Sequence, residues 1–383
     1  MNKEKIWLSS PHMGDKEQEF VNEAFETNWI APLGPHVNGL EKAIQDYNSI
    51  DHAAVLSSGT AALHLSMDLL DIGPGDYVLV QSFTFCASAN PITYRGAHPV
   101  FIDSEEDTWN MSPKALKEAL DYLSSQGKAD RIKAILPVHL YGNPSKMDEI
   151  MELANSYSVP VIEDAAESLG SKYGDVLTGT FGKLGVYSFN GNKIITTSGG
   201  GALVSHSKEL IDRSRFLATQ ARDEAPHYQH SAIGYNYRMS NVLAGIGRGQ
   251  MMVLNDRIEA RRANYFRYLD YFNAKNDLGY SVIFQEEEEN SFSNRWLTCI
   301  LVDPETNKGI SRENIRLTLE KENIEARPLW KPMHLQPVFE NELFFGDGTS
   351  ERLFEIGLCL PSGSNLSESD FERIFNTLDQ LFV

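Results

Sequence analysis

Short apolar runs alternate with amphipathic stretches through the first half of the chain. The runs are rich in β-branched residues and predict seven strands, at 52–58, 77–83, 98–104, 132–140, 159–165, 184–189 and 201–206. Between them, stretches such as 60–70 and 145–157 carry apolar residues at helical spacing. This alternation predicts an α/β fold with a mostly parallel seven-stranded sheet flanked by helices. The close spacing of the last strands predicts a less regular end of the sheet.

The second half of the chain has a different pattern. A helical pattern over 240–272 exceeds the usual helix length and predicts a helix that connects two domains. A strand-like run at 296–302 and helical patterns near 311–323 and 367–382 follow it. We therefore expect a large domain over 1–250 and a smaller α+β C-terminal domain over 251–383.

Composition and charge narrow the class of protein. The 383 residues are 42% hydrophobic and 23% charged, which is typical of a globular protein. A net charge of −19 argues against nucleic acid as the main partner, because duplex binding needs a basic surface. No apolar run approaches the roughly 20 residues of a membrane span, and the polar N-terminus does not resemble a signal peptide. We expect a cytoplasmic protein with no membrane partner.

The three cysteines, Cys86, Cys299 and Cys359, are far apart in the sequence and form no CxxC pair. An odd number without metal-site spacing predicts reduced thiols rather than a disulfide framework, and no metal site.

Candidate ligand-binding residues follow several of the predicted strands. Ligands of open parallel sheets bind at the carboxyl ends of the strands. The first strand ends in Ser57-Ser58-Gly59-Thr60 and runs directly into a helical pattern, a combination that suits an anion, although a simple serine cap explains it equally well. Neither a P-loop nor a GxGxxG motif is present after this strand. The glycines at 245–249 resemble that fingerprint only loosely and lie within a helical pattern.

Aromatic, acidic and basic residues follow three other strands. Phe85 comes after the second strand, Asp164 and Glu167 after the fifth, and Ser188 and Lys193 lie at and beyond the end of the sixth. Each has an ordinary alternative, as a core aromatic, a helix cap or a surface lysine. Together with the serine-glycine turn they provide a phosphate site, a stacking ring, an acid and a lysine. Pyridoxal phosphate requires this combination.

At these residues the sequence resembles the DegT/DnrJ/EryC1/StrS sugar aminotransferases, a family within fold type I of the pyridoxal-phosphate enzymes. The resemblance extends almost from end to end and is carried by the blocks NWIAPLGPHV, SSGTAALHL, HLYGNPSKMDEI, EDAAESLG, FNGNKIITTSGGG and GYNYRMSN. SNRWLT (293–298) and RPLWKPMHLQPVF (327–339) resemble the branch that aminates carbon 4 of UDP-linked 2-acetamido-4-keto-6-deoxy sugars, as in bacillosamine biosynthesis.

The resemblance implies roles for the cofactor site. Lys193 matches the lysine that binds pyridoxal 5'-phosphate as an internal aldimine, and Asp164 matches the acid beside the pyridine nitrogen. Glu167 matches a polar residue near the ring hydroxyl, at a position where the family varies. The remaining matches are Phe85 as the stacking aromatic, and Gly59, Thr60 and Ser188 around the phosphate.

The resemblance also implies a homodimer with composite active sites, because Asn236 and Arg238 match residues that reach the partner's site. Arg238 could also meet a carboxylate of the amino donor. Further candidates for substrate binding are Arg222, Tyr228, Trp330, Lys331 and His334, for which surface or domain packing is an equal alternative. His139, at another strand end, is better interpreted as a core histidine.

The implied activity is ping-pong transfer of an amino group from L-glutamate to carbon 4 of a UDP-2-acetamido-2,6-dideoxy-4-keto-hexose, in polysaccharide or glycan biosynthesis. The alternative substrate is GDP-4-keto-6-deoxymannose, as in perosamine synthases. A nicotinamide dehydrogenase would need the missing glycine fingerprint. Lys193 argues against the related sugar dehydratases, which carry histidine there, and Lys193 with Asp164 argues against a non-enzymatic regulator.

Overall fold

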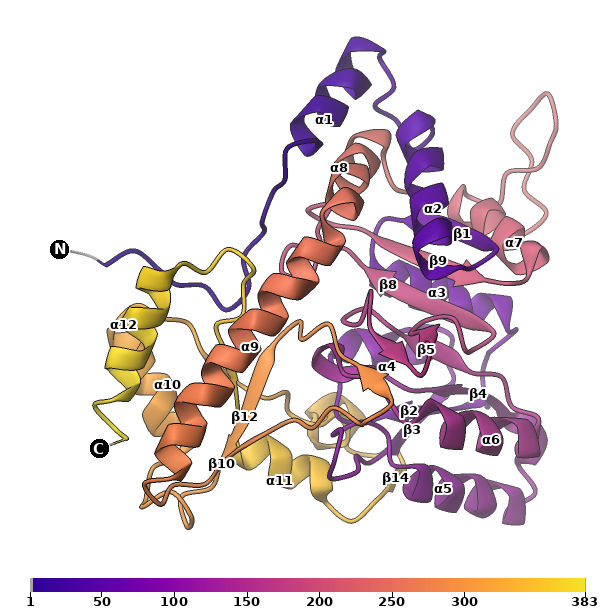
Figure 1. Cartoon of the computed structure of the whole chain (residues 1–383). Coiled ribbons are helices and arrows are strands. Elements are labelled where there is room, and N and C mark those ends of the chain that lie inside the picture. The colour runs from indigo at the N-terminus through magenta and orange to yellow at the C-terminus, as the bar shows by residue number, and fades with distance from the viewer. Residues whose placement is uncertain (1–2, 383) are drawn as a thin grey trace.

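The computed structural model describes residues 3–382, and all seven predicted strands are present in it (Figure 1). They are β1 (His52–Leu56), β2 (Tyr77–Gln81), β3 (His98–Ile102), β4 (Ile132–Leu136), β5 (Ile162–Asp164), β8 (Leu184–Ser188) and β9 (Gly201–Ser205). Each strand lies within the apolar run that predicted it.

Together with β14 (Phe344–Phe345), these seven strands form one continuous sheet in the order β1-β9-β8-β5-β4-β2-β3-β14. Two parallel bridges, Ile135–Val161 and Val138–Asp164, join its halves between β4 and β5. The strand pairs are parallel except that β9 runs antiparallel to both β1 and β8, which is the irregular end that the sequence predicted. The eighth strand, β14 (Phe344–Phe345), comes from the C-terminal part of the chain and extends the sheet beyond β3.

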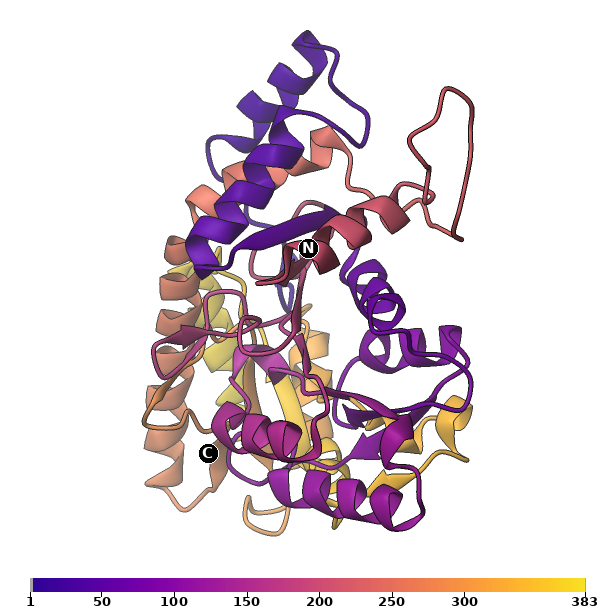
Figure 2. The same ribbon diagram turned by 90° about the vertical axis from the view of Figure 1, so that its right-hand side faces the viewer.

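Helices cover both faces of this sheet (Figure 2). The helices of the first part of the chain are α1 (Glu17–Glu26), α2 (Pro35–Asn48), α3 (Gly59–Leu69), α4 (Cys86–Tyr94), α5 (Pro113–Ser125), α6 (Met147–Tyr157) and α7 (Lys208–Ala218). Alternate residues of a strand point to opposite faces. Ala54 and Leu56 of β1 pack with α3 and α7, whereas Ala53 and Val55 pack with α2 on the opposite face. Helices α5 and α6 cover the same face as α2, at the end of the sheet formed by β2, β3 and β4.

The C-terminal part contains a second, antiparallel sheet in the order β10-β12-β15-β13. Its strands are β10 (Val282–Phe284), β12 (Thr298–Val302), β15 (Gly357–Leu360) and β13 (Arg327–Pro328). The helices α9 (Leu254–Asn276), α10 (Arg312–Lys321) and α12 (Glu368–Leu378) pack on it, and α11 (Thr349–Ile356) precedes β15. A small sheet of β11 (Ser291–Phe292), β6 (Lys172–Tyr173) and β7 (Val176–Leu177) connects the two halves of the sequence. The division near residue 250 stays a prediction.

The helical pattern over 240–272 forms two helices rather than one. Helix α8 (Asn241–Met252) ends at Met252, Val253 forms a turn, and α9 begins at Leu254. The glycines of α8 allow close packing on α1 and α2: a Cβ atom on Gly247 would lie 2.6 Å from Leu40, and one on Gly249 would lie 2.7 Å from the backbone nitrogen of Glu17. They are packing residues and do not bind a dinucleotide. Within residues 3–382 no helix is long and apolar enough to cross a membrane.

Candidate active site

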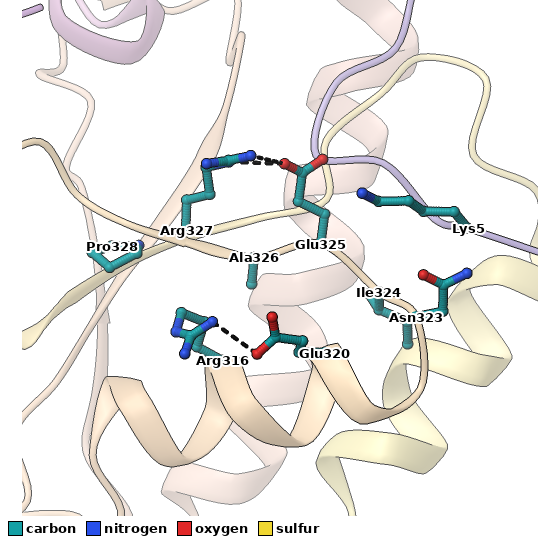
Figure 3. Close-up of a pocket in the computed structure, with 9 residues that line it drawn as sticks. All are labelled: Lys5, Arg316, Glu320, Asn323, Ile324, Glu325, Ala326, Arg327 and Pro328. Atoms are coloured by element: carbon teal, nitrogen blue, oxygen red, sulfur yellow. Dashed lines mark hydrogen bonds and ion pairs between the residues drawn. The ribbon is translucent and has the colours of Figure 1, made fainter.

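A cavity of about 610 Å³ lies at the carboxyl ends of the parallel strands. Eight of the predicted site residues line it: Gly59, Thr60, Phe85, Asp164, Glu167, Ser188, Lys193 and Trp330. The C-terminal part contributes Trp296 and the residues at the mouth, Glu325, Arg327 and Pro328 (Figure 3). The cavity therefore combines strand ends of the large sheet with residues that lie more than 100 positions further along the chain.

The N-terminus of α3 forms an anion-binding end of the cavity. Ser58 caps the helix, its Oγ accepting the N–H of Ala61 at 3.0 Å. The other N–H groups of a first turn have no acceptor within the helix, so they are available to a phosphate. The chain is tightly packed here, because a Cβ atom on Gly59 would lie 3.1 Å from Ser188 Cβ and one on Gly201 only 2.5 Å from the Gly59 nitrogen.

Asp164 ends β5 at the floor of the cavity and is only 4% exposed. Its carboxylate accepts Ser88 Oγ of α4 at 2.7 Å and the N–H of Ala166 at 3.1 Å. Burial raises the pKa of the Asp164 carboxyl above its ordinary value, while these hydrogen bonds and the charge of Lys193 act in the opposite direction. A cation placed against Asp164, such as a protonated pyridine nitrogen, would stabilise the ionised form.

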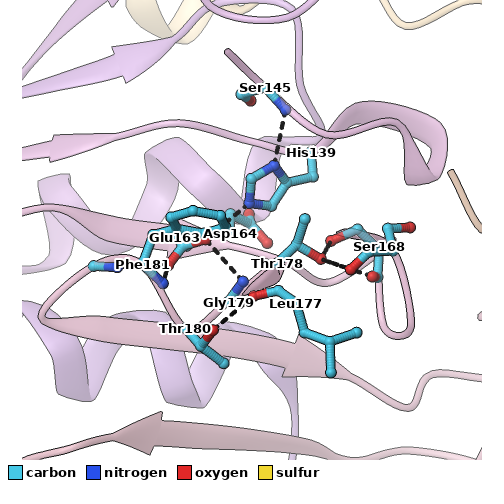
Figure 4. A network of polar contacts seen from close by, with 12 residues as sticks. His139, Ser145, Glu163, Asp164, Ser168, Leu177, Thr178, Gly179, Thr180 and Phe181 are labelled. Atoms are coloured by element: carbon cyan, nitrogen blue, oxygen red, sulfur yellow. Dashed lines mark hydrogen bonds and ion pairs between the residues drawn. The ribbon is translucent and has the colours of Figure 1, made fainter. Parts of the chain in front are cut away.

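A polar network behind Asp164 fixes the end of β5 (Figure 4). The neighbouring carboxylate of Glu163 accepts the N–H groups of Gly179, Phe181 and Gly182 at 2.7–2.8 Å. His139 accepts the N–H of Ser145 on Nδ1, so its Nε2 carries the hydrogen and donates to Glu163 at 3.1 Å. His139 is thus a satisfied core histidine, as predicted.

Lys193 lies in the loop after β8 and points into the cavity. Its Nζ is 3.1 Å from Glu167 Oε1 and 4.1 Å from the centroid of the Trp296 ring. Glu167 also accepts the N–H of Tyr141 at 2.7 Å through its other oxygen, and burial raises the pKa of this carboxyl. Lys193 is therefore held by an acid and an aromatic face rather than being a surface lysine.

Two aromatic rings stand over the other side of the cavity. Phe85 precedes α4 and packs against Trp330 with ring centroids 5.4 Å apart. Phe85 is nevertheless 55% exposed. A large aromatic side chain that is left this open within a cavity has a face available for a planar ligand.

The structure does not bring the other predicted residues to this cavity. The Arg222 guanidinium lies 4.5 Å from the ring of Tyr228, which is 78% exposed on the loop between α7 and α8. Asn236 lies at the base of that loop, paired with Thr219. Arg238 is buried and donates to Glu41 of its own chain at 3.1 Å. The place of Asn236 and Arg238 in a partner's site stays a prediction, as does substrate binding by Arg222 and Tyr228.

Lys331 and His334 follow Trp330 but are not in the cavity lining. Lys331 is exposed, and its carbonyl accepts the side chain of Gln336. The His334 ring stacks on Phe344 and lies between Ser82 and Glu351, with Nδ1 2.7 Å from Ser82 Oγ and Nε2 3.2 Å from Glu351 Oε1. In a single chain His334 is thus occupied by packing, which was the alternative considered for it.

Ser88, Tyr141 and Trp296 are parts of the site that the sequence did not identify. Tyr141 and Trp296 lie within matched blocks and Ser88 does not. The contact of Ser88 with Asp164 and that of Trp296 with Lys193 arise only through tertiary packing. The conformation of Tyr141, whose φ is +57°, likewise has no local sequence signal. The structure contains no group of three or more His, Cys, Asp or Glu residues placed to hold a metal ion within residues 3–382.

These groups fit pyridoxal phosphate: anion donors at α3, an open ring face at Phe85, a buried acid at Asp164 and a lysine between them. Fold and site together define a fold type I pyridoxal-phosphate enzyme. A model of the DegT/DnrJ/EryC1/StrS aminotransferase family matches residues 11–379, and the chain belongs to that family. It is an aminotransferase that depends on pyridoxal phosphate.

Similar proteins agree with this assignment. The chain is 52% identical to EpsN of Bacillus subtilis (strain 168), named as a pyridoxal phosphate-dependent aminotransferase, over 99% of this chain and 96% of that protein. It is 36% identical to GDP-perosamine synthase of Escherichia coli O157:H7 over 98% of both chains. A DegT/DnrJ/EryC1/StrS aminotransferase from Brucella abortus superimposes with a TM-score of 0.87 at 29% identity, over 96% of this chain and 95% of that one.

Proposed function

We propose that the protein transfers an amino group from L-glutamate to carbon 4 of a UDP-2-acetamido-2,6-dideoxy-4-keto-hexose. The observation that carries the proposal is the placement of Trp296 and Trp330 in the cavity with Lys193. Both tryptophans belong to the segments, SNRWLT and RPLWKPMHLQPVF, that resemble the UDP-sugar branch. Their position supports a role for these segments in holding the sugar.

When bound, pyridoxal phosphate supplies an electron-accepting ring that stabilises negative charge at the reacting carbon. Lys193, which lines the cavity, would act as base and then as acid in the proton transfer from the amino donor. With the cofactor bound, Asp164 would keep a proton on the ring nitrogen, Phe85 would cover the ring, and the first turn of α3 with Ser188 would hold the phosphate. Glu167 orients Lys193 through their hydrogen bond.

A second candidate substrate is GDP-4-keto-6-deoxymannose. It is favoured by the GDP-perosamine synthases of Escherichia coli O157:H7, Caulobacter vibrioides and Vibrio cholerae, which are 31–36% identical to this chain over nearly their whole length. The two substrates share the 4-keto group that the chemistry requires and differ in nucleotide and in the substituent at carbon 2.

We further propose a cytoplasmic homodimer with composite sites. Helix α1 and the loop that carries Arg222 and Tyr228 project from the same end of the molecule (Figures 1 and 2). Large apolar side chains are exposed on both, including Phe25 of α1 and Ile233 of the loop. A partner seated there would cover these side chains, and its own loop could reach the cavity. Light scattering measures the mass of the assembly. Mixed dimers of two different inactive variants would recover activity only if each active site contains residues of both subunits.

The absorption spectrum of the cofactor-loaded protein tests the reaction. L-Glutamate is expected to bleach the visible band, and the UDP-linked 4-keto sugar added after removal of glutamate is expected to restore it. Restoration by the GDP-linked sugar alone would select the second candidate. A band that glutamate does not change would contradict the proposed amino donor.

A further inference from the structure

The mouth of the cavity continues into a neighbouring surface pocket of about 430 Å³. Glu325, Arg327 and Pro328 line both hollows (Figure 3). The two hollows therefore meet at these residues, and an elongated ligand in the cavity has room to extend its outer part among them.

The N-terminal segment builds one wall of this mouth. It lies along the chain before β13, with a parallel bridge between Ile6 and Ile324 and a hydrogen bond from the Glu325 N–H to the Ile6 carbonyl at 2.9 Å. Side chains alternate along such a segment, so Ile6 is buried while its neighbours point away from the core. Trp7 is 52% exposed and lines the cavity, and Lys5 lines the adjoining pocket.

Two cations meet at the mouth. Arg327 donates to Glu325 through Nε at 2.8 Å, and Figure 3 shows Lys5 extending toward the same carboxylate from the opposite side. Lys5 has no acid within ion-pair distance among residues 3–382, and its Nζ lies 3.9 Å from the Trp7 ring centroid. Glu325 is further held by the N–H of Leu8 at 3.1 Å. The mouth thus has two positive groups around one carboxylate.

The inner end of the cavity, unlike the mouth, has more acidic than basic side chains. Asp164 and Glu167 are both acidic, and Lys193 is the one cation that lines the cavity there among the described residues. On the far wall of the outer pocket, Arg316 is paired with two acids, Glu313 and Glu320, whereas Arg327 is paired with one, Glu325. Lys5 therefore leaves a net positive charge at the mouth, and an anionic group outside the cofactor site is best placed within reach of both Lys5 and Arg327.

We propose that Lys5, Trp7 and Arg327 form the subsite for the nucleoside diphosphate of the sugar nucleotide. Lys5 and Arg327 bind the two phosphate groups, and the indole of Trp7 stacks on the base. This inference rests on the proposed function, since it takes the sugar at Lys193 and its diphosphate outward at the mouth. The N-terminal segment thereby becomes part of the substrate site.

Binding of free nucleotides to the cofactor-loaded protein tests this subsite without turnover. By isothermal titration calorimetry, Lys5→Ala is expected to weaken UDP binding about tenfold, the effect of one lost charge-assisted hydrogen bond. Lys5→Ala should weaken binding of UMP less, because UMP has one phosphate fewer. Lys5→Arg should bind UDP nearly as tightly as the wild type. Trp7→Ala is expected to weaken UDP and UMP to a similar extent.

Lys3→Ala is the matched control. Lys3 lies two residues from Lys5, has the same charge and is paired with Glu322 outside this pocket, so its loss should leave UDP binding unchanged. UDP binding by Lys5→Ala equal to that of the wild type would overturn the proposal, as would a wild-type protein that binds neither UDP nor GDP. The glutamate-induced change in absorption is measured separately, so failure of the aminotransfer reaction is distinguishable from failure of the subsite.

Discussion

Lys193 and Glu167 form a hydrogen-bonded ion pair, 3.1 Å from Nζ to Oε1, inside the cavity. The second oxygen of the Glu167 carboxylate accepts the N–H of Tyr141 at 2.7 Å. One buried carboxylate thus connects the lysine after β8 to the turn after β4. Glu167 orients the reactive amine and also completes the hydrogen bonding of the backbone.

Substitutions at Glu167 separate these two effects. Glu167→Gln keeps an acceptor for Tyr141, so the thermal midpoint should change little and the glutamate half-reaction should slow by about tenfold or less. Glu167→Leu leaves a buried N–H without an acceptor and is expected to lower the free energy of unfolding by about 1–3 kcal/mol. Stopped-flow absorption and thermal denaturation measure the two outcomes. Equal stability of both variants would contradict the backbone role.

Asp164→Asn should stabilise the cofactor-free protein while impairing catalysis. Burial raises the folded-state pKa of Asp164, so ionising it costs stability as the pH rises from about 4 through that raised value. Asparagine does not ionise, so the thermal midpoint of Asp164→Asn relative to the wild type should rise with pH over this range. Proton transfer should slow far more than cofactor affinity falls.

The matched control for Asp164→Asn is Asp121→Asn. Asp121 is on the surface, and its hydrogen bonds with Lys117 and Tyr157 lower the pKa of its carboxyl, so the sign of its contribution is opposite. That variant should not gain stability as the pH rises. Normal turnover by Asp164→Asn would show that Asp164 is not the acid beside the ring nitrogen.

Replacing the adjacent Glu163 by glutamine should lower the stability of the protein rather than raise it. Its two oxygens accept three backbone N–H groups and His139 Nε2. In Glu163→Gln an NH₂ group must face one or more of these donors, which is expected to cost about 1–3 kcal/mol of unfolding free energy. Urea denaturation measures this loss. A Glu163→Gln variant as stable as the wild type would contradict the network of Figure 4.

A substitution at Arg238 distinguishes a structural role, through its ion pair with Glu41, from the predicted role in substrate binding. The Glu41 carboxylate accepts Arg238, Arg215 and the N–H of Val55. Arg238→Gln should therefore reduce the free energy of unfolding by about 1–3 kcal/mol, with Arg215 limiting the loss. A variant with wild-type stability and a raised KM for glutamate or the sugar would instead support substrate binding by Arg238.

The large sheet could be predicted from sequence because its strands are short apolar runs bounded by polar or glycine residues. The helix at 240–272 was less predictable, since the break at Val253 leaves the apolar periodicity nearly unchanged. Likewise, the edge strand at Phe344 is only two residues long and pairs with β3 across more than 200 residues of sequence. Such pairing has no local signal.

The candidate site was predictable to the extent that its residues follow strands. Asp164 and Lys193 could be identified because strand ends converge at one edge of the sheet. Trp296 and Ser88 reach the same cavity from other elements, and their contacts depend on how these elements pack. The position of Arg238, buried against Glu41, likewise depends on a residue nearly 200 positions away.

We propose that Lys193 is the cofactor-binding lysine of this cavity. Borohydride reduction of the cofactor-loaded protein, followed by peptide mass spectrometry, tests this claim most directly. We expect a stable pyridoxyl adduct on the peptide that contains Lys193. The adduct should be absent in Lys193→Ala, which should still fold and bind the cofactor non-covalently. An adduct confined to another lysine, or unchanged labelling of Lys193→Ala, would contradict it.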